Sequence, residues 1–425
     1  MTPGARPAGP AGPARHPLQE AHPLVTEPRH PAAPPRRVIL LGATGSIGRQ
    51  AVDVISRFPD RFEVVGAVAR RDASGLRALV ERLGVSRVAL VAPDPDLEVP
   101  AGWGVGLEAA CEIAALPADV VCVAITGAAA LRPTLAALDA GTTVATATKE
   151  VLVMAGEVVR ARARRSGSRI LPIDSEHSAL WQCLRGEDPA SVTRLILTAS
   201  GGAFRDRDPA TLAAATPEEA LRHPTWNMGP KVTIDCATMM NKGLEVIEAH
   251  FLFDVDYPRI DVLIHPSSVV HSLVEFHDGA TKAQIGAPDM RVPIALALAD
   301  GERLPGVAAP ADLAALSPLA FRPVDPLRFP ALGVARRAGE RGGVVPAILN
   351  AANEVCVGAF LRGACRFDQI TDLVGEAVEA APAVTAPSLE DVLEADAWAR
   401  RRVTDALALP AGAAVSGPGG GVGAA

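Results

Sequence analysis

The amino-acid sequence predicts an α/β protein in three parts: a parallel sheet, a second α/β domain and a C-terminal helical bundle. Short β-branched strands are predicted at residues 38–41, 62–69, 87–91, 120–124, 143–146 and 170–172. They alternate with helical stretches, which is typical of a parallel sheet covered by helices on both faces. More strands follow between residues 194 and 276. Residues 329–407 then show long Ala/Leu/Val-rich helical periods that fit a small helical bundle.

The composition is that of a globular protein with room for two or three domains. The chain has 425 residues, of which 49% are hydrophobic and 21% charged. A formal net charge of −7 gives no reason to expect nucleic-acid or anionic-membrane binding, so any phosphate recognition must be local. No apolar run of 18 residues appears that could span a membrane. The six cysteines form no CxxC pair and no zinc-like spacing with histidine, which favours a reduced, cytoplasmic location.

The two ends of the chain differ from its centre. The first 35 residues are rich in Pro, Ala, Gly, Arg and His and lack the apolar segment of a secretory signal, so we expect a disordered extension. Residues 410–425 are rich in Gly and Ala and predict a disordered tail. A Pro/Ala-rich stretch, residues 301–327, is expected to be a linker before a helical domain over residues 328–409.

A glycine-rich turn follows the first predicted strand, residues 38–41. It reads Gly42-Ala-Thr-Gly-Ser-Ile-Gly48 and leads into an amphipathic helix. This order is typical of a dinucleotide-binding βα unit, in which glycines let the backbone approach a pyrophosphate. The next strand ends in Arg70-Arg71-Asp72, where two arginines favour a 2′-phosphate and hence NADP over NAD, although a solvated charge pair is the alternative. We therefore expect a Rossmann-like NADPH-binding domain over residues 36–173.

Two acids follow the last strand of this domain, in the run Pro172-Ile-Asp-Ser-Glu-His177. If the segment is extended, Asp174 and Glu176 point to the same side and can bind a divalent metal, with Ser175 between them. If a helix begins here, the acids are N-terminal caps with a structural role. We expect the catalytic domain, with the metal and substrate sites, over residues 174–300.

The run from Ile234 to Glu248 carries the most unusual polar set. Its β-branched start predicts a strand, which a polar turn connects to an amphipathic helix. Asn241, Lys242 and Glu245 would share one face of that helix at spacings of three and four residues. The helix start and the lysine would attract a phosphate, while the glutamate would supply a hard oxygen ligand. An ordinary Lys/Glu surface pair has the same spacing.

Three other segments predict contacts with a ligand. Lys149 stands at the carboxyl end of a strand, where doubly wound sheets bind ligands. Ser200-Gly-Gly offers a hydroxyl and bare backbone amides to a phosphate. The loop 222–230 holds His223 just before Pro224 and Trp226 between Pro224 and Pro230, which suggests an active-site lid. Each segment has an alternative: Lys149 could be a solvated helix residue, Ser200-Gly-Gly a plain turn, and the loop 222–230 a packing loop.

These residues belong to a longer series of motifs that resembles the 1-deoxy-D-xylulose 5-phosphate reductoisomerase family. The series follows the family's order over nearly the whole folded part of the chain. Its members are Gly42-Ala-Thr-Gly-Ser-Ile-Gly48, Asp174-Ser-Glu-His177, Ser200-Gly-Gly, His223-Pro-x-Trp226-x-Met228-Gly229, Ala237-Thr-Met-Met-Asn-Lys-Gly-Leu-Glu245, His265-Pro-x-Ser-x-Val-His271, Pro288-Asp-Met-Arg291 and Leu349-Asn-Ala-Ala-Asn-Glu354.

The resemblance implies an enzyme of the methylerythritol phosphate route to isoprenoid precursors. Such an enzyme uses NADPH and a divalent cation (Mn²⁺, Mg²⁺ or Co²⁺), acts on a sugar phosphate and is usually a homodimer. It rearranges and reduces 1-deoxy-D-xylulose 5-phosphate to 2-C-methyl-D-erythritol 4-phosphate.

Together with the residues already singled out, the resemblance implies a full set of site residues. The expected metal ligands are Asp174, Glu176 and Glu245. The expected catalytic and substrate contacts are Lys149, Ser175, Glu176, Ser200, His223, Trp226, Cys236, Asn241, Lys242 and Glu245. The expected cofactor contacts are Thr44, Gly45, Ser46, Ile47, Arg70, Arg71, Asp72, Thr148, Glu150 and Gly229.

Three residues depart from the family's usual pattern. Thr148, Cys236 and Ala203 stand where the family typically has Asn, Ser and Pro. Cys236 matters most, because the family's serine hydrogen-bonds the substrate phosphate and a thiol is a much weaker donor. The departures leave room for a paralogue with a shifted substrate or with tolerance to phosphonate inhibitors. A catalytically silent NADPH-binding protein is a third hypothesis, which three converging carboxylates argue against.

Overall fold

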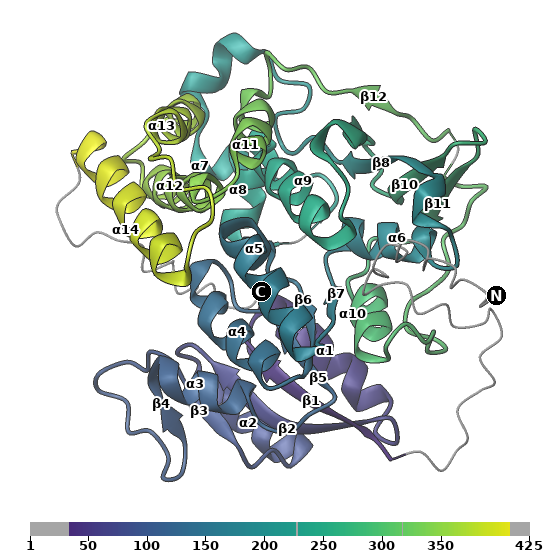
Figure 1. Ribbon diagram of the computed structural model, residues 1–425, viewed down its shortest axis with the longest axis vertical. Coiled ribbons are helices and arrows are strands. Elements are labelled where there is room, and N and C mark those ends of the chain that lie inside the picture. The colour runs from purple at the N-terminus through teal and green to yellow at the C-terminus, as the bar shows by residue number, and fades with distance from the viewer. Residues whose placement is uncertain (1–33, 227, 317, 409–425) are drawn as a thin grey trace, which may run out of the picture.

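The computed structural model describes residues 34–408 except 227 and 317. These residues form two sheets and a group of C-terminal helices (Figure 1). The expected disordered segments, residues 1–35 and 410–425, lie outside the described residues apart from 34 and 35. None of the helices in the described part of the chain is both long and apolar enough to cross a membrane.

The first sheet has seven parallel strands in the order β4-β3-β2-β1-β5-β6-β7. The strands are β1 (Arg36–Leu41), β2 (Phe62–Ala69), β3 (Val88–Leu90), β4 (Gly104–Val105), β5 (Val120–Val123), β6 (Thr143–Thr146) and β7 (Ile170–Pro172). All but the two-residue β4 coincide with predicted strands. The order runs outward in both directions from the β1/β5 pair, so the topological switch point, where such sheets bind ligands, lies between their carboxyl ends.

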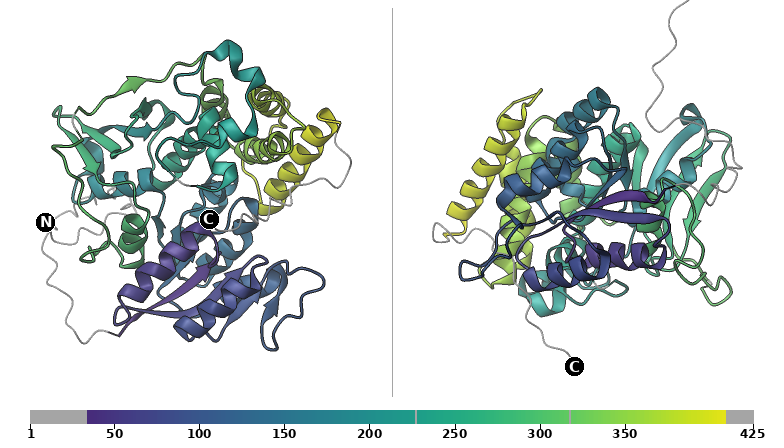
Figure 2. Two further views of the ribbon diagram at one scale, coloured as in Figure 1. Left: turned by 180° about the vertical axis from the view of Figure 1, so that it is seen from behind. Right: turned by 90° about the horizontal axis from the view of Figure 1, so that it is seen from below.

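Alternate residues of β1 show how the helices cover both faces of this sheet. Val38 and Leu40 pack with one set of helices, and Ile39 and Leu41 pack with the other, because successive side chains of a strand point to opposite faces. The first set is α1 (Ser46–Arg57), α2 (Ala73–Leu83) and α10 (Arg291–Leu298). The second set is α3 (Gly106–Ala114), α4 (Leu131–Asp139) and α5 (Lys149–Ser166). Figure 2 shows the layers from behind and from below.

The second sheet has five strands in the order β11-β10-β8-β9-β12, with only the β8/β9 pair parallel. The strands are β8 (Val192–Ala199), β9 (Ile260–Ile264), β10 (Val270–Phe276), β11 (Thr281–Ile285) and β12 (Arg322–Pro323). Helix α6 (Ser175–Leu184) packs on β10, and α9 (Met240–Phe253) packs on β8 and β9. The sequence did not predict β11 or β12, and β12 lies inside the expected linker.

The strand predicted at Ile234 is wrong. Residues Pro230–Thr238 form helix α8, and Met239, with φ 66°, separates it from α9. Gly229 at the N-cap and Pro230 at the first position start the helix. Lys231 and Asp235 then form an i,i+4 ion pair at 2.9 Å. Burial of the β-branched residues on this helix overrides their strand propensity.

Four helices form the predicted C-terminal bundle: α11 (Pro330–Arg341), α12 (Val345–Leu361), α13 (Phe367–Glu379) and α14 (Leu389–Ala406). The central helix, α12, packs against the other three and also against α5 and α8 (Figure 1). Nearly every residue of α12 from Val345 to Phe360 is buried. The bundle is therefore joined to both sheets through helices that also carry predicted site residues.

Candidate active site

A cavity of about 1490 Å³ opens at the switch point of the first sheet and extends to the second sheet and to α12 and α14. Every site residue expected from the sequence lines this cavity. These are Thr44, Gly45, Ser46, Ile47, Arg70, Arg71, Asp72, Thr148, Lys149, Glu150, Asp174, Ser175, Glu176, Ser200, His223, Trp226, Gly229, Cys236, Asn241, Lys242 and Glu245. Predicted site residues that lie up to about 200 positions apart in the sequence thus line the same cavity.

The glycine-rich turn forms one end of the cavity. Gly42 has φ 88°, and a Cβ atom there would lie 2.4 Å from the carbonyl oxygen of Ala124, which follows β5. Only glycine therefore allows the loops after β1 and β5 to approach so closely. Residues 44–47 line the cavity beside this contact and begin α1, so their backbone N–H groups stand where a pyrophosphate is bound in dinucleotide folds.

Arg70, Arg71 and Asp72 follow β2 and are exposed at the rim of this end. Asp72 caps α2, because its carboxylate accepts a hydrogen bond from the backbone N–H of Gly75 at 2.8 Å. This cap gives Asp72 a structural role whether or not it touches a cofactor. The two arginines carry the positive charge at this rim.

Replacing Arg71 by alanine is expected to raise the KM for NADPH about tenfold, since a hydrogen bond to a charged group contributes about 1.5 to 3 kcal/mol. The KM for NADH should change little, because NADH has no 2′-phosphate. Steady-state kinetics with both cofactors measure the ratio. Arg82→Ala is the control, because Arg82 is exposed on α2 and does not line the cavity. Equal effects of Arg71→Ala on both cofactors would contradict the assignment.

The segment that holds Asp174 and Glu176 begins a helix, so the prediction of an extended segment is wrong. Asp174 is the N-cap of α6, and its carboxylate accepts a hydrogen bond from the backbone N–H of Glu176 at 3.2 Å. Even so, carboxylate oxygens of Asp174, Glu176 and Glu245 lie within 4.8 Å of one another. Three carboxylates at this spacing fit the oxygen donors that Mg²⁺ and Mn²⁺ prefer.

Two buried lysines contact the same carboxylates. The Nζ atom of Lys149 lies 3.0 Å from Asp174 Oδ2 and 3.0 Å from Glu245 Oε1. Lys242 forms an ion pair with Glu245 and lies 3.2 Å from Glu176 Oε1. The surface-pair interpretation of Lys242 and Glu245 is therefore wrong, because their side chains are 5% and 1% exposed. Buried ammonium groups beside the carboxylates give this part of the cavity donors for the oxygen atoms of an anionic ligand.

The close charges shift the pKa values of this cluster. Burial disfavours the charge on Lys149, but the Asp174 and Glu245 carboxylates outweigh burial and raise the pKa of the lysine. Burial likewise opposes the charge on Asp174, but Lys149 and His177 keep the pKa of Asp174 well below its usual value. Burial raises the pKa of Glu176 to about 7, with Lys242 opposing the shift and the neighbouring carboxylates adding to it.

Asn241 completes the connection between the helices. Its amide Nδ2 donates to Glu245 Oε1, and its Oδ1 accepts a hydrogen bond from Lys149 Nζ at 2.8 Å. The residue lies in the first turn of α9 and is 9% exposed. Asn241, Lys242 and Glu245 therefore share one face of α9, as their i,i+3 and i,i+4 spacing predicted. This face points into the protein interior toward α5.

Ser200 and the two glycines after it form a turn at the second sheet. Gly201 and Gly202 have φ values of 82° and 66°, and a Cβ atom on Gly202 would lie 2.5 Å from the carbonyl oxygen of Cys236. The turn therefore lies directly against the end of α8. Ser200 Oγ accepts a hydrogen bond from the backbone N–H of Gly202 at 3.1 Å.

The predicted lid loop is tied to this turn through His223. The backbone N–H groups of Thr225 and Trp226 donate to His223 Nδ1 at 3.2 and 2.9 Å. The other ring nitrogen, Nε2, therefore carries the proton and donates to Ser200 Oγ at 2.8 Å. Burial, with a contribution from Arg205, lowers the pKa of His223 to about 4, so the ring is neutral near pH 7.

This pKa predicts that the loop loses stability in mild acid. The folded-state pKa of His223 lies below its ordinary value of 6.5, so the unfolded chain binds the proton more tightly and stability falls as the pH drops from about 6.5 toward 4. Because the ring is only partly buried, we expect a loss of about 1 kcal/mol between about pH 7 and about pH 5. Urea unfolding at both pH values should show a smaller loss in His223→Gln. An equal loss in that variant would contradict the prediction.

The structure also places Lys231 and Asp235 at the cavity, although the sequence did not single them out. Lys231 Nζ lies 2.9 Å from Glu150 Oε1 and 2.9 Å from Asp235 Oδ2, and Asn353 Nδ2 donates to Asp235 Oδ1 at 2.7 Å. Asn353, from the Leu349–Glu354 motif, is fully buried inside α12, so it braces α8. An i,i+4 Lys/Asp pair usually faces solvent, which is why spacing alone did not distinguish Lys231.

A partly buried ion pair within the bundle lies beside the first sheet. Glu354 on α12 accepts hydrogen bonds from Asn350 and from Arg400 on α14, at 3.2 and 2.6 Å. A Cβ atom on Gly127, after β5, would lie 2.8 Å from Glu354 Oε1. The C-terminal helices therefore form part of the cavity wall next to the loop after β5.

The parallel sheet, its glycine-rich turn and the carboxylate cluster at the switch point define a dinucleotide-dependent oxidoreductase with a candidate site for a divalent cation. Three family models match the chain in succession. They are described as 1-deoxy-D-xylulose 5-phosphate reductoisomerase (residues 38–156), 1-deoxy-D-xylulose 5-phosphate reductoisomerase C-terminal domain (170–253) and DXP reductoisomerase C-terminal domain (285–402). The chain belongs to the 1-deoxy-D-xylulose 5-phosphate reductoisomerase family, as the sequence motifs indicated.

Individual relatives agree with this assignment over most of their length. The 1-deoxy-D-xylulose 5-phosphate reductoisomerase of Pelotomaculum thermopropionicum is 48% identical over 380 residues, which cover 86% of this chain and 97% of the relative. That of a Geobacillus species is 47% identical over 378 residues, which cover 87% and 99%.

Solved structures of the family share the fold. The enzyme from Zymomonas mobilis in complex with NADPH has a TM-score of 0.82 and 42% identity, covering 88% of this chain and 99% of that one. A DOX-P reductoisomerase in complex with NADPH, fosmidomycin and magnesium has a TM-score of 0.82 and 38% identity, covering 88% and 98%. The predicted fold class is confirmed.

Proposed function

We propose that this protein catalyses the NADPH-dependent rearrangement and reduction of 1-deoxy-D-xylulose 5-phosphate to 2-C-methyl-D-erythritol 4-phosphate. The observation that carries the proposal is the convergence of Asp174, Glu176 and Glu245 with Lys149 and Lys242 in the same cavity as the glycine-rich turn. The family of the chain and the NADPH and magnesium complexes of its relatives support the same cofactors.

The residues of the cavity divide into groups with different roles. Ser200, Asn241 and Lys242 supply donors for the substrate phosphate, and Cys236 stands beside them at the cavity wall. Binding energy from the phosphate helps to hold the reacting end of the sugar in place. Trp226, with its ring 6.2 Å from that of His271, is the apolar group that would exclude water when the loop covers the substrate.

The reacting end of the sugar would lie at the carboxylates. A divalent cation held by Asp174, Glu176 and Glu245 would supply Lewis-acid polarisation of the ketose carbonyl. NADPH would supply the hydride that reduces the aldehyde formed by the rearrangement. Lys149 lies between two of the carboxylates, where its ammonium group can donate to a substrate oxygen and keep the skeleton oriented.

The direct test is the oxidation of NADPH by the purified protein with 1-deoxy-D-xylulose 5-phosphate and Mg²⁺, followed by product identification. We expect 2-C-methyl-D-erythritol 4-phosphate and an absolute requirement for the divalent cation. Binding of NADPH and Mn²⁺ without any turnover would favour the catalytically silent alternative. Turnover with other ketose phosphates in preference to this substrate would favour the paralogue.

We also propose the homodimer that the family resemblance implies. Leu313 and Leu327 are 60% and 89% exposed, and Leu319 and Phe321 are also exposed, in the segment that carries the edge strand β12. These side chains are candidates for a subunit contact. Light scattering should give twice the chain mass, and Leu327→Asp should shift the protein toward the monomer. A monomeric wild type at micromolar concentration would contradict the proposal.

Two further expectations remain proposals. The cytoplasmic location is supported by the six cysteines, all of which are free thiols. The proposed domain boundaries, at residues 173/174, 300/301 and 327/328, can be tested by limited proteolysis. Helix α10, near the end of the second proposed domain, packs against α1 of the first, so we expect these two domains to resist separation.

A further inference from the structure

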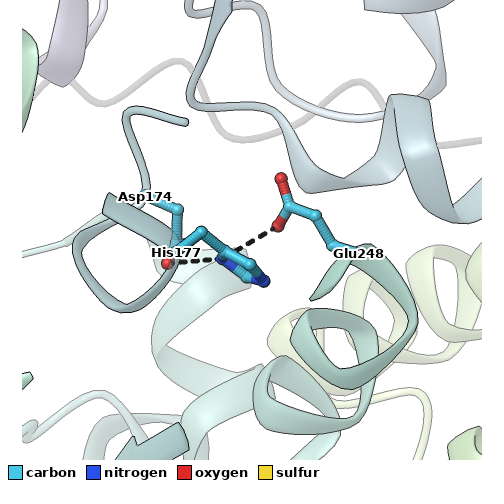
Figure 3. A group of neighbouring side chains, drawn as sticks. All are labelled: Asp174, His177 and Glu248. Atoms are coloured by element: carbon cyan, nitrogen blue, oxygen red, sulfur yellow. Dashed lines mark hydrogen bonds and ion pairs between the residues drawn. The ribbon is translucent and has the colours of Figure 1, made fainter. Parts of the chain in front are cut away.

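A buried carboxyl group that the proposed function does not use lies next to the candidate cation site. Glu248 is on α9, three residues after Glu245, and is 0% exposed. Neither of its carboxylate oxygens has a hydrogen-bond partner among the described residues. Its ion-pair contact there is with Nδ1 of His177, at 3.4 Å (Figure 3). A carboxyl group with so few partners is rarely kept inside a protein.

His177 connects the two helices that carry the carboxylate cluster. Its Nδ1 lies 3.1 Å from Asp174 Oδ1, and its Nε2 lies 2.9 Å from the backbone carbonyl oxygen of Glu245. Phe253 stacks on the ring with an interplanar angle of 9°, and the histidine is 0% exposed. Both ring nitrogens therefore face oxygen atoms, one of Asp174 and one of the α9 backbone, so the ring links the two helices.

We propose that Glu248 and His177 are positioning residues that hold Asp174 and Glu245 at the spacing a divalent cation requires. The inference rests on the metal ligands assigned under the proposed function. One nitrogen of the ring fixes the carboxylate of Asp174 on α6, and the other fixes the backbone of Glu245 on α9. Glu248 Oε2 lies 3.4 Å from Nδ1 of His177 and so helps to hold the ring between the two ligands.

The geometry allows one competing interpretation. Ligand atoms of Asp174, His177 and Glu248 lie within 4.8 Å of one another, so these three residues could hold a second cation. The contacts favour positioning, since Nδ1 lies at hydrogen-bond distance from Asp174 and at ion-pair distance from Glu248 (Figure 3). The number of bound cations distinguishes the two interpretations.

The test is Mn²⁺ binding to the full chain with saturating NADPH, measured by electron paramagnetic resonance of the free ion. Glu248→Gln keeps the side-chain size and removes the charge. We expect it to bind Mn²⁺ about 10- to 100-fold more weakly, the usual range for groups that orient a metal ligand, and to bind NADPH as the wild type does. Asp300→Asn is the matched control, because Asp300 is partly buried and paired with Arg169 at 2.8 Å but does not line the cavity, so its Mn²⁺ affinity should be unchanged.

A double-mutant cycle separates positioning from general destabilisation. If Glu248 acts through His177, then Glu248→Gln should weaken Mn²⁺ binding far less in a His177→Gln background than in the wild type. Glu248→Asp, which keeps the charge, should recover part of the affinity and serves if the glutamine variant does not fold.

Two results would overturn the proposal. The first is an unchanged Mn²⁺ affinity in Glu248→Gln. The second is a wild type that binds a second Mn²⁺ that this variant loses, since Glu248 would then be a ligand. Glu245→Gln checks the ligand set separately: if that variant still binds Mn²⁺ normally, the ligand assignment fails whatever Glu248 does.

Discussion

Glu245→Gln is expected to abolish turnover while leaving NADPH binding nearly intact. The side chain is 1% exposed, and its carboxylate contacts Lys149, Lys242 and Asn241 as well as facing the candidate cation site. Glutamine cannot supply the negative charge, so both the cation and the two ammonium groups lose a partner. A loss of about 4 kcal/mol of transition-state stabilisation, within the range for metal-assisted catalysis, lowers the rate roughly a thousandfold.

The glycine-rich turn lies on a different segment, so cofactor affinity should survive the change. Turnover with 1-deoxy-D-xylulose 5-phosphate and NADPH titration by fluorescence measure the two quantities, and thermal unfolding reports whether the variant is folded. Asp174→Asn should behave in the same way. Glu157→Gln is the control, because Glu157 is exposed on α5 and should leave both quantities unchanged. Near-normal activity of either site variant at low metal concentration would show that the three-carboxylate assignment is wrong.

The first sheet was predictable because its strands are buried on both faces. A strand such as Val38–Leu41 is an uninterrupted apolar run, and a glycine-rich turn marks its end, so periodicity and turn chemistry agree. Two-residue strands at the sheet edges, β4 and β12, carry no such pattern. Their strand character comes from pairing with a neighbour, which is a tertiary contact.

The local geometry of the site was harder to predict than the identity of the residues that line it. Asp174 and Glu176 converge on Glu245 although a helix begins between them, so the metal-ligand and N-cap interpretations of Asp174 are compatible. The approach to α9 is helical because Gly229 and Pro230 start α8 and burial overrides the strand propensity of Ile234. The inward orientation of Lys149 depends on carboxylates from two other segments, which spacing along the chain cannot show.

Cys236→Ser is expected to tighten binding of the substrate and of phosphonate inhibitors. Cys236 lies in the last turns of α8, lines the cavity and has its backbone against Gly202 of the Ser200 turn. Burial raises the pKa of its thiol to about 12, so the group is an uncharged thiol and a weak donor. A serine hydroxyl at this place can donate to a phosphate oxygen. Because hydrogen bonds to charged groups contribute about 1.5 to 3 kcal/mol, we expect the Kd to fall about tenfold or more.

The wild type should still bind its ligands, because Ser200, Asn241 and Lys242 also face the cavity. The wild type should be less sensitive than Cys236→Ser to a phosphonate such as fosmidomycin, because the wild-type thiol gives the inhibitor a weaker contact than the serine hydroxyl would. Calorimetric titration of both ligands against wild type and Cys236→Ser measures the difference. Cys111→Ser is the control, because Cys111 is also partly buried and lies on α3, away from the cavity lining. If Cys236→Ser leaves both affinities unchanged, then this position does not contact the phosphate, and the thiol serves only to pack α8 against the Ser200 turn.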